Sequence, residues 1–197
     1  MLSLPVLNEH QTSSGPCVGL GFAAFDIAYN FTLATYNLTD GIASPGDTPA
    51  RLTMVTFEES PPVTIGALTP YASYPQTLFR NFSMINGTLI PTGATGLTAS
   101  NFDVYAGSAL LFKYSQVPEE VDPGAQIYCA MANTDPAGGG IPYPVLAVNG
   151  DLNGFSLCLT DDNGAGHYNV VYQAQEGNEH YDYSTCYPVS INLLGLF

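Results

Sequence analysis

The stretch 145-VLAVNGDLNGFSLCLTDDNGAGHYNVVY-172 contains three short apolar or alternating runs that are separated by two turn-forming segments. The segments at 149–154 and 161–166 are rich in Asn, Asp and Gly, which tolerate the positive φ that tight turns require. Short runs with β-branched and aromatic side chains between such turns are typical of β-strands. This stretch therefore predicts an antiparallel meander.

The rest of the chain repeats the same pattern of short runs and turns. Strand-like runs are expected at 19–36, 52–57, 77–90, 102–114, 126–132 and 187–197. No segment of helical length keeps a 3.6-residue apolar period without a Gly or Pro inside it. We therefore expect an all-β chain of about 10–12 short antiparallel strands, folded as a β-trefoil-like domain or a β-sandwich. Three Phe-polar-aliphatic triplets, at 31–33, 82–84 and 155–157, favour the trefoil, although their spacings are uneven.

Length predicts one domain, because 197 residues suffice for one sizeable core but are few for two. Residues 1–16 are expected to form an N-terminal arm or edge strand, and residues 17–197 a single all-β domain. The two ends, 1–7 and 189–197, are apolar and uncharged. They pair with strands of their own domain, or they add to the sheet edge of another copy. No apolar run reaches the roughly 18 residues that a membrane-spanning helix needs.

The charge balance excludes several classes of partner. The chain has 17 acidic residues against three basic ones, Arg51, Arg80 and Lys113, which gives a net charge of −14. Nucleic acid requires a patch of Lys and Arg, and anionic membrane surfaces attract basic segments. We therefore expect neither a nucleic-acid nor a membrane partner. Apolar residues make up 46% of the chain, so the scarcity of charge does not indicate disorder.

The cysteine count favours an extracellular chain. Four cysteines are present, at Cys17, Cys129, Cys158 and Cys186, and none forms a C-x-x-C pair of the zinc-binding type. An even number of cysteines in a secreted protein predicts two disulfides, for which three connectivities are open. The alternative is a cytosolic protein with buried free thiols.

Four Asn-x-Ser/Thr acceptors for N-glycosylation are present, at Asn30, Asn37, Asn81 and Asn86. From 25 to 33 the odd positions are apolar and the even positions are small or polar, so Asn30 is expected to face solvent. Asn81 alternates with Phe82 and Met84, Asn86 opens an Asn-Gly hairpin turn, and Asn37 follows a strand end. All four are thus predicted on solvent faces or loops, as glycan attachment requires.

Catalytic residues are not expected. A Ser-His-Asp triad would need one of His10, His167 and His180, but no G-x-S-x-G elbow accompanies them. The acidic clusters at 119–122, 161–162 and 176–182 fall in predicted turns, where Asp and Glu are usually solvated. The loop at 161–164 could bind Ca²⁺, but it lacks the closing bidentate Glu of an EF-hand. We expect no metal and no cofactor, and a secreted hydrolase is the second alternative function.

Tyrosine is abundant, with 13 residues and no tryptophan. Four tyrosines that lie late in the chain are candidate sugar-contact residues, because aromatic faces stack on sugar rings: Tyr168, Tyr172, Tyr181 and Tyr183. They define the first alternative function, a carbohydrate-binding module. The other interpretation is that tyrosines fill strands and pack with their hydroxyls at the surface.

Three segments, at 82–89, 155–158 and 180–186, resemble the fungal secreted cell-wall proteins of the PhiA type. They look like that family's strand-turn-strand with an x-Gly-x-Leu turn, its late cysteine strand and its closing Tyr-rich segment. This chain departs from the family pattern at Leu159, where the family tends to have Pro. The resemblance implies a fungal, secreted, wall-associated glycoprotein without catalysis. It also implies that Cys158 pairs with Cys186, which leaves Cys17 for Cys129.

The sequence and the resemblance together predict an extracellular, cell-wall-associated structural protein that is N-glycosylated and not an enzyme. Its expected partners are cell-wall polysaccharide or a second copy of itself, bound through the apolar terminal strands.

Overall fold

The computed structural model describes residues 15–60, 63–75, 77–93, 97–115, 123–133, 140–160 and 166–196. These residues form 14 β-strands and one short 3₁₀ helix, η1 (Tyr71–Ser73). The strands are β1 (Ala24–Phe25), β2 (Ala28–Thr39), β3 (Ile42–Ala43), β4 (Ala50–Ser60), β5 (Val63–Pro70), β6 (Phe79–Ile85), β7 (Thr88–Gly93), β8 (Ala99–Asn101), β9 (Leu111–Ser115), β10 (Tyr128–Met131), β11 (Val145–Val148), β12 (Phe155–Thr160), β13 (His167–Tyr172) and β14 (Asp182–Leu194). The all-β class is confirmed. The count exceeds the expected value of about 10–12, because two-residue strands such as β1 and β3 are too short to leave an alternating pattern.

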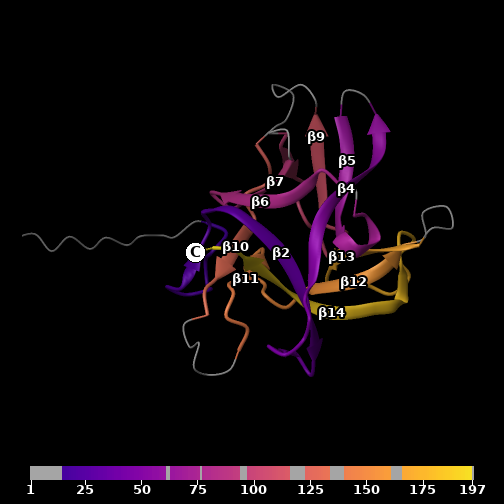
Figure 1. Ribbon diagram of the computed structural model, residues 1–197. Helices are drawn as coiled ribbons and strands as arrows, with labels where there is room; N and C mark the ends of the chain where they lie inside the picture. The colour runs from indigo at the N-terminus through magenta and orange to yellow at the C-terminus, as the bar shows by residue number, and fades with distance from the viewer. Residues whose placement is uncertain are drawn as a thin grey trace, which may run out of the picture.

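The strands join into one antiparallel sheet (Figure 1). Its order is β1-β10-β11-β14-β2-β6-β4-β5-β9-β8, and β12, β3 and β7 branch from β14, β2 and β6, with β13 beside β12. The long strands β2, β4 and β14 each pair with two or more neighbours. Because strands twist, a long strand can change partners along its length, and the sheet folds around one core.

The far branches of the sheet meet each other and enclose that core. Ala109 forms an isolated bridge with Val171 of β13, and the amide of Leu110 donates to the carbonyl of Val170 at 3.0 Å. The hydroxyl of Thr69 at the end of β5 donates to the carbonyl of Tyr168 at 2.5 Å. The largest fully buried side chains include one from each region of the sheet: Phe31, Phe82, Phe112, Tyr128 and Phe155. One apolar cluster therefore connects strands from β2 to β14.

The stretch 145–172 forms the three predicted strands, but the predicted pairing of the first strand with the second is wrong. β12 and β13 form the expected hairpin, with Phe155 opposite Tyr172. β11, however, pairs with β10 and β14 rather than with β12. The Asn149-Gly150 turn has positive φ at both residues, as predicted, but it closes only a tight Val148–Asp151 bridge before the chain turns away. Strand β14 pairs with the edge of β11 where the predicted meander would place β12.

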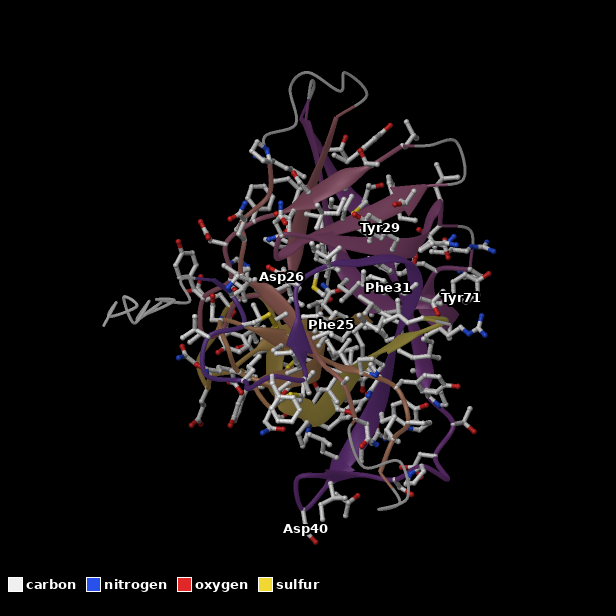
Figure 2. All side chains as sticks on the ribbon, turned by 90° about the vertical axis from the view of Figure 1, so that its left-hand side faces the viewer. Phe25, Asp26, Tyr29, Phe31, Asp40 and Tyr71 are labelled. Carbon is white, nitrogen blue, oxygen red and sulfur yellow. A yellow bond between two sulfur atoms is a disulfide. The ribbon has the colours of Figure 1, made fainter. Side chains whose placement is uncertain are left out.

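The alternation predicted from 25 to 33 breaks at a β-bulge. Ala28 and Phe31 are buried and contact β6, whereas Ile27 and Tyr29 are 48% and 62% exposed. The register shifts between Ala28 and Phe31, where Asn30 has a φ of 52°. An extra residue in a bulge leaves two neighbouring side chains on the same side. Tyr29 and Asn30 therefore both face solvent, and Tyr29 and Phe31 are labelled in Figure 2.

The apolar C-terminal strand lies inside the sheet of its own chain. This corrects the interpretation that it pairs with a sheet edge of another copy. Residues 189–194 of β14 pair with residues 37–32 of β2, and Asn192 pairs with Val145 of β11 on the other side. The side chains of Val189, Ile191 and Leu193 are completely buried. Since both edges are paired, this strand has no free hydrogen-bonding edge to offer a partner. Of the predicted N-terminal arm, residues 1–14 lie outside the described residues, and Gly15 and Pro16 belong to a turn.

Both disulfides are present, with the pairing that the family resemblance implied. Cys17–Cys129 joins the turn at 15–20 to β10, and Cys158–Cys186 joins β12 to β14. The described residues contain no free cysteine. The two covalent loops span 112 and 28 residues and do not overlap in sequence, so each restricts a different part of the unfolded chain.

The loop lengths predict unequal stabilisation by the two disulfides. In the chain-entropy treatment, loops of 112 and 28 residues correspond to about 5 and about 3.5 kcal/mol of stability. We expect the double variant C17A/C129A to lose about 1 kcal/mol more unfolding free energy than C158A/C186A. Urea denaturation of both variants and the parent protein measures this difference. A larger loss in C158A/C186A would contradict it.

Tyr128 offers a second test of the core. Its side chain is fully buried, its hydroxyl has no hydrogen-bond partner in the described part of the chain, and burial raises its pKa. An unpaired buried hydroxyl destabilises a protein by roughly 1–3 kcal/mol. We expect Tyr128→Phe to raise the free energy of unfolding by about 1 kcal/mol.

Tyr172→Phe is the matched control. The Tyr172 hydroxyl donates to Asp151 Oδ2 at 3.2 Å and accepts from Gln173 Nε2 at 2.9 Å. Its removal should lower stability by about 1 kcal/mol. Equal destabilisation of the two variants in urea would contradict the assignment of Tyr128 as unpaired.

Candidate functional site

Three of the four glycan acceptors lie along one ladder of the sheet. Phe31 of β2 pairs with Phe82 of β6, and the amide of Asn30 donates to Ser83 Oγ at 3.3 Å, so Asn30 and Asn81 are close in the ladder. The following turn lies beside the same strand, because the amide of Gly87 donates to the Asp26 carbonyl at 3.1 Å. The ladder thus places Asn30, Asn81 and Asn86 on one surface, and all three are exposed.

The local backbone explains why asparagine occupies two of these positions. Asn30 and Asn86 have φ values of 52° and 49°, in the left-handed region that Asn tolerates better than most residues. Asn86 and Gly87 together form the two-residue hairpin turn between β6 and β7 that the sequence predicted. An Asn at such a position therefore has a structural reason besides glycan attachment.

Asn37 is the fourth acceptor, and it lies apart from the other three. It was expected just past a strand end, but β2 continues to Thr39 and Asn37 pairs with Val189 of β14. Its side chain is nevertheless exposed. All four asparagines therefore present their side chains to solvent, and their glycosylation stays a prediction.

The four candidate sugar-contact tyrosines do not share one open surface. Tyr172 and Tyr181 are each only 6% exposed, and the Tyr181 hydroxyl accepts from the amide of Gln175 at 2.8 Å. Tyr168 is half-buried and packs edge-on against Tyr187, with ring centroids 5.7 Å apart. Tyr183 is 45% exposed. Of the four rings, Tyr183 is the one with a large exposed face for a sugar.

The pKa is raised for one of these phenols, Tyr172, and for Tyr187, which packs against Tyr168. Burial raises the pKa of Tyr172, and the nearby Asp151 carboxylate raises it further. Burial also raises the pKa of Tyr187, with a smaller contribution from Tyr168. Raised phenol pKa values keep these groups neutral at ordinary pH, which suits packing and hydrogen bonding rather than nucleophilic or basic chemistry.

The histidines have different surroundings. His167 is buried at the start of β13, and its Nδ1 lies 3.1 Å from the Tyr74 hydroxyl. The Tyr74 ring also packs edge-on against His167, with centroids 5.2 Å apart. His180 is exposed in the turn before β14, and His10 lies outside the described residues. The contacts between His167 and Tyr74 thus join β13 to the η1 region.

The carboxylates of the acidic cluster at 176–182 are exposed to solvent. Glu176, Glu179 and Asp182 are all exposed, and Asp182 accepts from the amide and hydroxyl of Ser184. The acidic clusters at 119–122 and 161–162, together with the calcium-like loop at 161–164, lie outside the described residues. Within the described part, no three His, Cys, Asp or Glu side chains gather as metal ligands do. No helix there is long and apolar enough to span a membrane.

Two hollows lie near η1. One, of about 340 Å³, is lined by residues of β4, η1 and the segment before β6, and it carries no charged side chain. The other, of about 190 Å³, is lined by Thr32, Arg51, Leu52, Tyr71 and Arg80. Sequence reasoning missed this second pocket. The one hint in the sequence was that the chain has only three basic residues, two of which, Arg51 and Arg80, line this pocket. These two residues are 29 positions apart, and the pairing of β4 with β6 brings them together.

Searches of protein-family models, of curated proteins and of solved structures find no match to this chain.

Proposed function

We propose that this chain is a secreted, N-glycosylated structural protein of the fungal cell wall, without catalytic activity. The observation that carries the proposal is the solvent exposure of all four glycan acceptors in a chain whose four cysteines are paired. Disulfides form and persist in oxidising compartments, which are also where N-glycans are attached. The fungal and cell-wall parts of the proposal rest on the resemblance of three segments to the PhiA type.

The architecture supports a scaffold role. One core connects strands from both ends of the described chain, and two covalent links fasten the N-terminal turn and the last strand to it. The histidines and carboxylates whose surroundings are described are engaged in packing or are solvated in turns. A sugar-bearing, cross-linked sheet suits a passive component of a polysaccharide matrix.

Self-association is a second element of the proposal, and it now rests on the N-terminal region. The C-terminal strand is paired with β2 and β11 of its own chain, so it has no free edge for pairing with a second copy. The turn after Pro16 exposes apolar side chains, with Val18 52% and Phe22 100% exposed. In the sequence, residues 8–17 separate them from the apolar residues of 1–7. We propose that this region binds a second copy of the chain.

Secretion from a fungal host tests the glycoprotein proposal. We expect the parent protein to lose mass on treatment with peptide-N-glycosidase, and to be retained in the washed wall fraction. Asn→Asp at 30 and 86, where Asp tolerates the left-handed backbone, and Asn→Gln at 37 and 81 should each remove one glycan. Unmodified asparagines, or a protein found only in the medium, would contradict the corresponding part of the proposal.

Size-exclusion chromatography at high protein concentration tests self-association. We expect the full chain to elute as an oligomer, and chains lacking residues 1–14 to elute as monomers. Phe22→Ser is the matched point variant, because this fully exposed side chain contributes nothing to the core. A full-length protein that remains monomeric would exclude the assembly role and leave the glycoprotein proposal intact.

A further inference from the structure

Two of the three basic residues of this acidic chain converge on one pocket. Arg51 and Arg80 both line the hollow of about 190 Å³ at the outer side of β2, β4 and β6. Thr32, Leu52 and Tyr71 complete the lining. In Figure 2, Tyr71 lies at the margin of the molecule among side chains that end in nitrogen atoms. A chain with a net charge of −14 thus concentrates positive charge at a single hollow.

The strand register explains the convergence. Arg51 of β4 lies opposite Ala34 of β2, and Phe79, which precedes Arg80, lies opposite Met54 of β4. β2 and β6 also pair directly next to this point. Side chains alternate across a strand, so the half-buried Thr32 and the exposed Arg51 and Arg80 lie on the face opposite to the buried core residues.

Arg80 is held in place before any ligand arrives. Its guanidinium lies over the Tyr71 ring, 4.9 Å from the centroid, and its Nη2 donates to the Pro75 carbonyl at 2.9 Å. The Tyr71 hydroxyl donates to the same carbonyl at 3.0 Å, which fixes the ring as well. A guanidinium has five N–H donors, so most of them remain free. Fixing the side chain in advance lowers the entropy cost of binding.

Neither arginine is neutralised by a neighbour. Within the described ranges, no Asp or Glu carboxylate lies within salt-bridge distance of Arg51 or Arg80. Two guanidinium groups at one hollow repel each other unless an anion lies between them. The fork of N–H groups on an arginine matches the two oxygens of a carboxylate. The pocket therefore has the charge and the donor geometry for one carboxylate.

We propose that this pocket binds a single carboxylate-bearing sugar unit, a uronate. The arginines take the carboxylate, and the hydroxyl groups of Thr32 and Tyr71 meet sugar hydroxyls. Pockets for drug-sized ligands measure roughly 300–1,000 Å³. At about 190 Å³ this one accommodates a single sugar unit rather than a longer segment.

The overall negative charge selects for an isolated acidic sugar. Charges farther away than the Debye length, about 8 Å at physiological ionic strength, are largely screened, whereas direct contacts are not. A polyanion carries many charges that the net charge of −14 repels. One uronate in an otherwise neutral glycan meets only the two arginines. This inference goes beyond the proposed function and does not depend on secretion, glycosylation or self-association.

Titration of the disulfide-bonded protein with glucuronate, followed by calorimetry or NMR, tests the site. Any N-glycans should first be trimmed with an endoglycosidase, which leaves one sugar on each asparagine. Peptide-N-glycosidase is unsuitable here, because it converts the glycosylated Asn to Asp and would add a carboxylate at position 81, beside Arg80. We expect a Kd of about 1 mM, typical of a small ligand held by few contacts, and at least a tenfold weaker Kd in Arg51→Gln and in Arg80→Gln. Lys113→Gln, which changes the third cation outside the pocket, should bind like the parent protein.

Three results would overturn the proposal. Unchanged binding in both arginine variants, with their folds verified by thermal melting, would exclude the pocket. Equal binding of glucose would exclude recognition of the carboxylate. Equal binding of acetate or inorganic sulfate would exclude recognition of the sugar.

Discussion

The pairing of β14 with β2 holds an early and a late segment of the described chain together. Residues 189–194 of β14 lie antiparallel to residues 37–32 of β2, which joins segments more than 150 residues apart. Closing so long a loop has a large entropy cost, which buried contacts must offset. Ile191 and Leu193 bury their side chains completely, and Asn192 donates to the Tyr143 carbonyl at 3.0 Å across the neighbouring strand. The same residues therefore contribute to both the ladder and the core.

This constraint also determines what the surface can present. With β14 paired on both sides, the C-terminal strand has no free edge for intermolecular pairing, whereas the N-terminal turn exposes apolar side chains, among them the fully exposed Phe22. The same β2 that pairs with β14 pairs elsewhere with β4 and β6. Its outer face carries Asn30 and Thr32, so the proposed glycan surface and the proposed uronate pocket are neighbours on one strand.

Local signals in the sequence predicted local structure well. The Asn-Gly turns at 86–87 and 149–150 occur with the expected positive φ, and the β12–β13 hairpin forms as its alternating residues indicate. Alternation failed at residues 27–30, since a bulge inserts a residue without altering composition. The insertion of β14 between β11 and β12 could not be predicted either, because strand order depends on packing between distant segments.

The candidate sites likewise divide into those that local sequence predicts and those that depend on distant segments. All four asparagines are exposed as predicted, and for Asn81 and Asn86 the predicted reasons, alternation and turn chemistry, hold. Asn30 lies instead in a bulge that breaks the alternation, and Asn37 lies within β2 rather than past its end. The disulfide pairing came from a family resemblance rather than from the spacing of the cysteines. The arginine pocket needs the registers of three strands at once, and no local pattern contains them. The tyrosines were misleading as a group because β-propensity places aromatic residues in strands whether or not they face a ligand.

Amide hydrogen exchange under native conditions tests the central role of β14 most directly. Amides at 190–194 should be among the slowest in the protein, exchanging only through global unfolding, because their opening would separate β2, β11 and β14 together. The amide of Leu193, which donates to the Pro144 carbonyl at 2.9 Å, is a well-placed reporter. Exchange of these amides at the rate of an exposed turn would show that the C-terminal strand opens separately, and would contradict this account of the fold.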